Sequence, residues 1–452
     1  MSSREDASRA LTSFTHSARR RAWLVEPPRA RCFGNEHGAL RKFWEDGLAL
    51  GGAKTSMKIA FVNARYAPNE FGGAERTVRT IAETHVAHGH EACAISVAHD
   101  KSQREGELNG VRTRYVPLTH VYEPWKERPG LLKRALFQAV DSYHPLMGAR
   151  VGRILDEEKP DLVQCGNLRD FSVAVWVEAK KRGLPVVQML HDYYLGCANS
   201  SMFRQGKNCE TQCAHCRVLC APRRALSNTP RAVISLSGRT LAKLEGCGLF
   251  EEVPHKQVIF GISNQSVDDE TRAPEEKAGL VVGYLGRIER TKGVETLLEA
   301  ASLIRHSKFR VLLGGTGDRD YMVELRGRYS SPAIHFLGYV KPAEFFGRID
   351  VLVVPSLWEE PLGRVIYEAY ARGVAVIANR LGGMPEIIEE GRTGYVVTPG
   401  DVKELAAVIE QMLTTQRRSD FRSACLAKAK EFSAERRYPE YASVWQRALS
   451  ET

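Results

Sequence analysis

The chain has 452 residues, of which 43% are hydrophobic and 26% are charged, so it is long enough for two globular domains with ordinary cores. It contains no apolar run of the roughly eighteen residues that a membrane-spanning helix needs, and no segment resembles the apolar region of a secretory signal. Its net charge of +10 is uneven, because residues 57–250 carry +8 and residues 251–452 carry −2. No nucleic-acid-binding motif accompanies the basic half, so we expect no nucleic-acid partner; an anionic membrane surface and a merely solvated basic face both remain open.

The first 56 residues are rich in Arg and Ser and show no sustained periodicity. We predict a poorly ordered extension there, which would lie outside the native protein if translation starts at Met57. From Met57 onward, strand-like runs alternate with helix-like segments. The predicted strands are 58–63, 92–98, 162–165, 185–190 and 232–235, and the predicted helices include 74–88, 147–158 and 172–182. Because this alternation is typical of a doubly wound parallel sheet, we predict a Rossmann-like α/β domain over residues 57–262.

An acidic, proline-containing stretch at 263–277 separates this series from a second one. The second set of predicted strands is 280–285, 309–314, 334–337, 350–354 and 374–378. It predicts another Rossmann-like domain over residues 278–436, which faces the first across a cleft where strand ends bind ligands. The final segment, 437–452, is amphipathic, and we expect it to pack back on the first domain.

The run V-L-V-V-P-S-L-W-E-E-P-L-G-R-V-I-Y-E at 351–368 is the most informative stretch. It predicts a buried strand, a tight loop and a helix start whose free N–H groups attract anions, with Glu360 in the loop and Glu368 in the helix. Glutamates at such positions also serve only to complement the helix dipole. Eight helical residues span about 12 Å, whereas glycoside hydrolases hold their carboxyl pair about 5 to 9.5 Å apart. The spacing therefore argues against two carboxylates acting on one bond.

Three further loops follow predicted strands and would reach the same cleft. Arg287 and Lys292 lie in the loop after the 280–285 strand, where a guanidinium fork and an ammonium group would hold a diphosphate. Gly72 and Gly73 follow the first strand and would allow close backbone approach to a ligand. His191 follows the 185–190 strand; a lone histidine is more often structural, but its position at the carboxyl end of a strand favours a functional role.

These motifs together resemble those of retaining glycosyltransferases with the GT-B fold, in the group 1 (family 4) class. The resemblance rests on F-G-G-A-E at 71–75, L-H-D at 190–192, G-R-I-E-R-T-K-G at 286–293, and the glutamates at 360 and 368. It extends over nearly all of the chain after the extension. It implies a GT-B arrangement of two Rossmann-like domains facing a cleft.

The resemblance also implies roles for individual residues. His191 and Glu360 would act at the reacting sugar. The implied donor-binding residues are Gly72, Gly73, Arg287, Lys292, Leu362, Gly363, Arg364 and Glu368. Arg287 and Lys292 would hold the diphosphate, and Glu368 would accept hydrogen bonds from the ribose.

The resemblance further implies transfer from a UDP- or GDP-sugar to a glycan or lipid-linked acceptor, with retention of configuration and no catalytic metal. The expected location is the cytoplasm or the inner face of the membrane. A nucleotide-sugar epimerase or hydrolase and a non-catalytic nucleotide-sugar-binding module are the alternatives.

A cluster of cysteines follows the histidine motif. Cys197, Cys209, Cys213 and Cys216 have a C-x11-C-x3-C-x2-C spacing, and Cys220 lies nearby. Four thiolates with one C-x2-C pair suit a structural, tetrahedral zinc ion, which we predict here. Unligated or disulfide-linked thiols and an iron–sulfur cluster are the alternatives.

Overall fold

The computed structural model describes residues 56–69, 72–98, 104–122, 130–265, 267, 279–413 and 415–450. The predicted extension lies outside these ranges apart from its last residue, and so does most of the predicted linker at 263–277. Residues 56–452 form one compact unit. We call residues 56–265 the first half and residues 279–433 the second half.

An eight-stranded sheet forms the core of the first half. Its strands are β1 (Lys58–Val62), β2 (Glu91–Val97), β3 (Glu105–Leu108), β4 (Val111–Val116), β5 (Leu162–Cys165), β6 (Val186–Leu190), β9 (Ala232–Ser235) and β10 (His255–Val258). They are ordered β10-β9-β6-β5-β1-β2-β4-β3, and all neighbours run parallel except the β3–β4 pair. The order reverses between β5 and β2, on either side of β1, and a doubly wound sheet binds its ligands at such a point.

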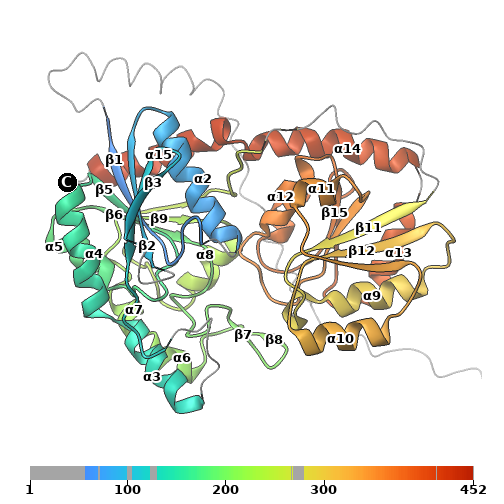
Figure 1. Ribbon diagram of the computed structural model, residues 1–452, viewed down its shortest axis with the longest axis horizontal. Coiled ribbons are helices and arrows are strands. Elements are labelled where there is room, and N and C mark those ends of the chain that lie inside the picture. The colour runs from blue at the N-terminus through green and yellow to red at the C-terminus, as the bar shows by residue number, and fades with distance from the viewer. Residues whose placement is uncertain are drawn as a thin grey trace, which may run out of the picture. The chain divides into compact units, whose positions relative to one another are not determined.

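Helices cover both faces of this sheet (Figure 1). The helices of this half are α2 (Gly73–Ala87), α3 (Leu131–Ser142), α4 (Pro145–Glu158), α5 (Ala174–Lys181), α6 (Ala214–Leu219), α7 (Ala221–Ala225) and α8 (Gly238–Glu245). Of these, α2, α4, α5 and α8 contact strands of the sheet, whereas α3, α6 and α7 contact one another. The side chains of β1 point alternately to the two faces of the sheet, and all of them are apolar from Ile59 to Val62. Ile59 and Phe61 join the apolar cluster that contains the buried side of α2, whereas Ala60 and Val62 join the cluster built on α4 and α5. A strand that is apolar on both faces must be buried on both faces.

The second half is built on a six-stranded, all-parallel sheet. Its strands are β11 (Leu280–Leu285), β12 (Phe309–Gly314), β13 (Ile334–Gly338), β14 (Val351–Val354), β15 (Ala375–Asn379) and β16 (Gly394–Val397), in the order β13-β12-β11-β14-β15-β16. Its helices are α9 (Val294–Leu303), α10 (Arg319–Arg328), α11 (Pro342–Phe346), α12 (Arg364–Tyr370), α13 (Val402–Gln411) and α14 (Thr415–Ala429). Short 3-10 turns are η1 (Arg290–Lys292), η2 (Met384–Ile387) and η3 (Lys430–Phe432). The predicted fold class, two doubly wound α/β sheets, is confirmed.

The structure contains strands that the sequence pattern did not predict. β10 reads H-K-Q-V and β3 reads E-G-E-L, and neither contains a fully buried residue. Both lie at an edge of the sheet, where charged side chains face solvent and protect the free edge from pairing. An edge strand of this kind has no apolar run that would reveal it.

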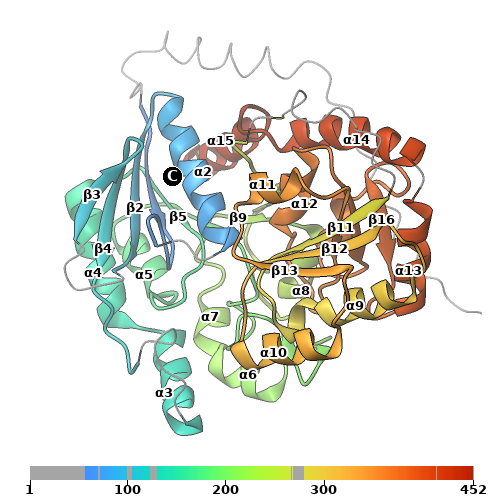
Figure 2. The same cartoon turned by 45° about the vertical axis from the view of Figure 1, so that its right-hand side comes forward.

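The terminal helix α15 (Ala434–Ser450) packs on the sheet of the first half beside α2 (Figure 2). Trp445 is fully buried, and its ring meets Phe61 of β1 edge-on with centroids 6.2 Å apart. The chain passes between the halves twice, after Ser263 and after Phe432. These two points are adjacent, since the Ser263 N–H donates to the Phe432 carbonyl at 2.7 Å. Residues 451–452, the end of the predicted 437–452 segment, lie outside the described ranges.

Candidate active site

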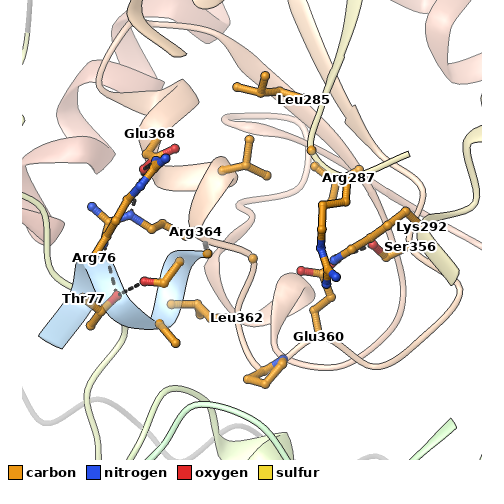
Figure 3. Close-up of a pocket in the computed structure, with 18 of the residues that line it drawn as sticks. Arg76, Thr77, Leu285, Arg287, Lys292, Ser356, Glu360, Leu362, Arg364 and Glu368 are labelled. Atoms are coloured by element: carbon orange, nitrogen blue, oxygen red, sulfur yellow. Dashed lines mark hydrogen bonds and ion pairs between the residues drawn. The ribbon is translucent and has the colours of Figure 1, made fainter. Parts of the chain in front are cut away.

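A pocket of about 570 Å³ is lined by residues of both halves. Its walls come from the loops that follow β1, β6, β11 and β14, all at the carboxyl ends of parallel strands. All ten residues predicted to be catalytic or donor-binding line it: Gly72, Gly73, His191, Arg287, Lys292, Glu360, Leu362, Gly363, Arg364 and Glu368. Figure 3 shows Glu360 and Glu368 on opposite sides of the pocket, each with its own cations. The structure therefore brings the predicted residues together but keeps the two glutamates apart.

Glu360 is held by partners within the second half. Lys292 Nζ lies 3.0 Å from Glu360 Oε1, and the Ser356 hydroxyl donates to the same oxygen. Burial alone would raise the pKa of Glu360, but Lys292 and the Ser356 hydrogen bond outweigh it and lower the pKa below its ordinary value. Glu360 is thus a carboxylate at neutral pH, and it orients the lysine expected to meet a phosphate.

Arg287 is the most exposed of the predicted cations. Its side chain is 71% exposed and lies 3.4 Å from Glu289 in the same loop. Lys292 is only 16% exposed, and its ammonium lies 5.2 Å from the centre of the Trp358 ring. The two side chains therefore differ in how closely they are held: Lys292 lies between a carboxylate and an aromatic ring, whereas Arg287 projects from the rim of the pocket.

Glu368 is already paired in this structure. Arg364 Nε donates to Glu368 Oε1 at 2.8 Å, and Arg76 Nη1 of α2 lies 3.8 Å from the same oxygen. Arg364 also reaches the first half, where its Nη1 donates to Thr77 Oγ1 at 3.1 Å. A Cβ at Gly73 would lie 3.3 Å from the Arg364 side chain, so the glycine leaves room for this contact. That Glu368 contacts a ribose stays a prediction.

Leu362 and Gly363 lie directly before α12. Gly363 has φ of +86°, a left-handed conformation that favours glycine, and no side chain caps the helix start. Leu362 is buried, 3% exposed. The Ile366 N–H donates to the Gly363 carbonyl at 3.0 Å, and the N–H groups before it have no side-chain cap among the described residues.

His191 is a buried histidine without a hydrogen-bond partner among the described residues. Both of its ring nitrogens are buried and unpaired. Burial lowers the pKa of His191 to about 4, so the ring is neutral at physiological pH. A Cβ at Gly166 would lie 3.3 Å from the His191 ring and 2.4 Å from Asn63 Oδ1, so only glycine fits beneath the ring. Neutral, unpaired nitrogens in a pocket wall suit hydrogen bonds to hydroxyl groups of a ligand.

Several pocket residues were missed by the sequence analysis. Asp192 accepts hydrogen bonds from Asn167 Nδ2 and from the Tyr194 N–H, both at 2.7 Å, and burial raises its pKa to about 6. Glu75 has a buried carboxylate oxygen with no partner among the described residues. Both residues belong to motifs already quoted, L-H-D and F-G-G-A-E, so their adjacency to His191 and Gly73 was the available signal.

The cysteine cluster lies outside the pocket lining. Cys216 Sγ lies 3.9 Å from Cys197 Sγ, and all four predicted ligands are free thiols. Within the described ranges, no group of three or more His, Cys, Asp or Glu side chains is arranged to hold a metal ion. The zinc ion therefore stays a prediction.

Comparison with known proteins supports one family. A model of glycosyltransferase 4-like domains matches residues 72–254, and a model of group 1 glycosyl transferases matches residues 279–415. Together the two matches cover more than two thirds of the chain. An uncharacterized 42.6 kDa protein in the cps region of Klebsiella pneumoniae is 28% identical over 336 residues, which are 73% of this chain and 87% of the relative. An uncharacterized glycosyltransferase, MJ1607 of Methanocaldococcus jannaschii, is 28% identical over 380 residues, 79% of this chain and 89% of its own.

Solved structures share the fold. Sucrose-phosphate synthase from Thermosynechococcus elongatus superposes with a TM-score of 0.69 at 19% identity, over 88% of this chain and 100% of its own. Anabaena HepE in complex with UDP and glucose superposes with a TM-score of 0.64 at 22% identity, over 86% of this chain and 99% of its own. In the described part of the chain, no helix is both long and apolar enough to cross a membrane. The chain belongs to the group 1 glycosyltransferases and has the GT-B fold.

Proposed function

We propose that the chain transfers a sugar from a nucleotide-diphosphate-sugar, a UDP- or GDP-sugar, to a glycan or lipid-linked acceptor with retention of anomeric configuration. The observation that carries the proposal is the single pocket that holds all ten predicted residues. The complexes of HepE with UDP, with UDP and glucose, and with UDP-glucose support a nucleotide-sugar donor. The relative in a cps region supports a role in the synthesis of a polysaccharide or glycolipid.

The cations on one side of the pocket suit the leaving group. The bond that breaks joins the anomeric carbon to the diphosphate oxygen, and negative charge develops on that oxygen. In the proposed function Lys292 and Arg287 stabilise this charge, and Lys292 is prealigned for it by the 3.0 Å contact with Glu360. Glu360 then accepts hydrogen bonds from hydroxyls of the donor sugar. The acceptor oxygen bonds to the same face of the anomeric carbon, and its proton passes to the departing phosphate oxygen.

Uncharged and acidic groups of the first half suit the hydroxyls of sugars. His191 is neutral because its pKa lies at about 4, so it can both donate and accept a hydrogen bond but carries no charge toward the donor. The unpaired oxygen of Glu75 offers a second acceptor on the same wall. We assign these two residues to hydroxyl groups of the donor or acceptor sugar.

The exposed face of α3 supports the lipid-linked form of the acceptor. Leu132 and Leu136 are 87% and 53% exposed and lie one helical turn apart beside Lys133 and Arg134. Leucines flanked by cations suit an anionic membrane surface. Co-sedimentation with vesicles of phosphatidylglycerol and phosphatidylcholine tests this: Leu132→Glu with Leu136→Glu should abolish binding. Equal sedimentation of the wild type with purely zwitterionic vesicles would contradict the anionic preference.

The donor is tested first by thermal shift with a panel of nucleotide-sugars and free nucleotides, since binding to the folded state raises Tm. Radiolabelled transfer from the donor so identified then compares Lys292→Ala with Arg290→Ala. Arg290 is the matched control, because it lies in the same loop but pairs with Glu295 and Glu324 outside the pocket. We expect Lys292→Ala to lose about 100-fold in kcat and Arg290→Ala to retain activity. Equal activities of the two variants would exclude the proposed role of Lys292.

A further inference from the structure

A small β-hairpin extends from the first half toward the second (Figure 1). Its strands β7 (Phe203–Arg204) and β8 (Lys207–Asn208) pair antiparallel through a two-residue turn. Gln205 and Gly206 in this turn have φ of 51° and 76°, the left-handed pair typical of a tight hairpin. The two-residue turn makes the hairpin a short projection.

Asn208 connects the hairpin to the loop that precedes Glu360. Its Nδ2 donates to the Leu357 carbonyl at 2.8 Å, and its Oδ1 accepts from the Glu359 N–H at 2.9 Å. One side-chain amide thus pairs with two backbone groups of the loop, on either side of Trp358. Such two-point pairing fixes both the position and the orientation of the backbone.

Other residues of the first half hold the same loop. Arg239 Nη2 lies 2.6 Å from Glu359 Oε1, and Lys243 pairs with the other oxygen of Glu359. The rings of Tyr193 and Trp358 meet edge-on with centroids 6.4 Å apart. The loop is therefore fixed from the first half through its backbone, the Glu359 carboxylate and the Trp358 ring, and Glu360 follows directly.

The cysteine cluster anchors the root of the hairpin. The hairpin lies between Cys197 and Cys209, and Asn208 is the residue before Cys209. The Cys209 N–H donates to the Met202 carbonyl at 2.7 Å, and Cys197 Sγ lies 3.9 Å from Cys216 Sγ. The backbone bond from Cys209 thus closes the root of the hairpin, and the thiol contact joins the segment before the hairpin to α6 after it.

We propose that Asn208 is a positioning residue: the cysteine-anchored hairpin fixes the loop 357–359 from the first half and so sets the place of Glu360 in the donor site. The proposal rests on the proposed function in one respect, because Glu360 is the sugar contact of that function. It adds a task for the cysteine cluster, which lies outside the pocket but acts on it through Asn208.

Hydrogen exchange tests the contact without any nucleotide. The Glu359 amide hydrogen is itself the one bonded to Asn208, so its exchange, resolved by electron-transfer fragmentation, reports the contact directly. Asn208→Ala should accelerate this exchange at least about tenfold. Asn208→Asp should keep most of the protection, since a carboxylate can accept from the amide but cannot donate to the Leu357 carbonyl. Lys207→Ala, an exposed neighbour on the same strand, is the matched control. Unchanged exchange in Asn208→Ala would overturn the proposal.

Kinetics with the donor found by thermal shift test the consequence. We expect Asn208→Ala to lower kcat about tenfold with a smaller change in the donor KM, because misplacement of Glu360 is felt most in the transition state. An unchanged kcat alongside accelerated exchange would refute the positioning role. If no nucleotide-sugar binds the wild type, the proposed function fails, whereas the exchange result still decides whether the hairpin holds the loop.

A cysteine variant tests the anchor. Cys216→Ser should accelerate exchange both in the hairpin peptide 203–208 and at Glu359, while peptides of β12 in the second half stay unchanged and show that the protein is folded. Faster exchange in the hairpin alone would overturn the link between the cysteines and the loop.

Discussion

The buried, neutral state of His191 makes a quantitative prediction about stability and pH. Burial lowers its pKa from 6.5 to about 4 in the folded protein, whereas the unfolded chain keeps the ordinary value. As the pH falls through 6.5, the unfolded state takes up a proton that the folded state refuses, so the folded state loses stability. The loss amounts to about 2 kcal/mol at pH 5 and to about 0.1 kcal/mol at pH 7.5.

Replacement of His191 by Gln removes this penalty. We expect the free energy of unfolding of the variant to rise by about 2 kcal/mol relative to the wild type when the pH is lowered from 7.5 to 5.0. Urea denaturation followed by fluorescence at both pH values measures the difference. The other histidines whose pKa is lowered by burial, His85, His90 and His120, are present in both proteins and cancel in the comparison.

His335→Gln is the control, because it removes an exposed histidine of β13 and leaves His191 in place. The reasoning would be refuted if the stability difference between the wild type and His191→Gln were independent of pH. That result would mean that His191 titrates alike in the folded and unfolded states. The pocket wall would then accommodate a charged ring, and the assignment of a purely neutral hydrogen-bonding role would fail.

Three further predictions follow from single contacts. Gly166→Ala should lower the free energy of unfolding in urea by about 1–3 kcal/mol, because its Cβ would lie 2.4 Å from Asn63 Oδ1. Gly327→Ala is the control and should not lower it, because nothing lies within 4 Å of the added Cβ. Equal stabilities of the two variants would contradict the close packing beneath the histidine. Glu75→Gln should raise the KM for the acceptor or the donor about tenfold, through loss of a charged hydrogen-bond acceptor, and an unchanged KM for both substrates would remove it from the site. Metal analysis should find about one zinc per chain, reduced in Cys213→Ser, and less than half an equivalent in the wild type would exclude the zinc site.

The sequence predicted the location of the site because its signals are local. The run Val351–Val354 is apolar on both faces and predicts a buried parallel strand, and the loop after it carries Glu360. Parallel strands present their carboxyl ends at one edge, so loops after different strands must meet there. That argument needs no knowledge of distances, and the loops that it brings together do line one pocket; Leu362, Gly363 and Arg364 were added by the family resemblance.

The pairing within the site depends on contacts that no local pattern encodes. Glu368 is paired with Arg364 one turn away, and a spacing of four residues in a helix does suggest this pair. Arg76 of α2 contacts the same carboxylate although it lies 292 positions away in the sequence. Likewise, Asn208 accepts a hydrogen bond from the Glu359 N–H, although the two residues are 151 positions apart in the sequence. An asparagine before a cysteine in a polar hairpin has no periodicity or motif that would reveal such a partner.

Because α15 packs back on the sheet of the first half, the first half can finish folding only after the second half has been synthesised. His85 of α2 bonds to the Tyr438 hydroxyl at 2.9 Å across 353 positions, and Trp445 donates to Gln164 of β5 across 281. During synthesis the part of this sheet face over β6, β9 and β10, which α15 contacts, therefore stays uncovered while the whole second half is made, and α2 covers the part over β2 and β4. Residues 57–262 expressed alone would present this uncovered apolar part to solvent, and a separate peptide of residues 434–450 is the piece that would close it.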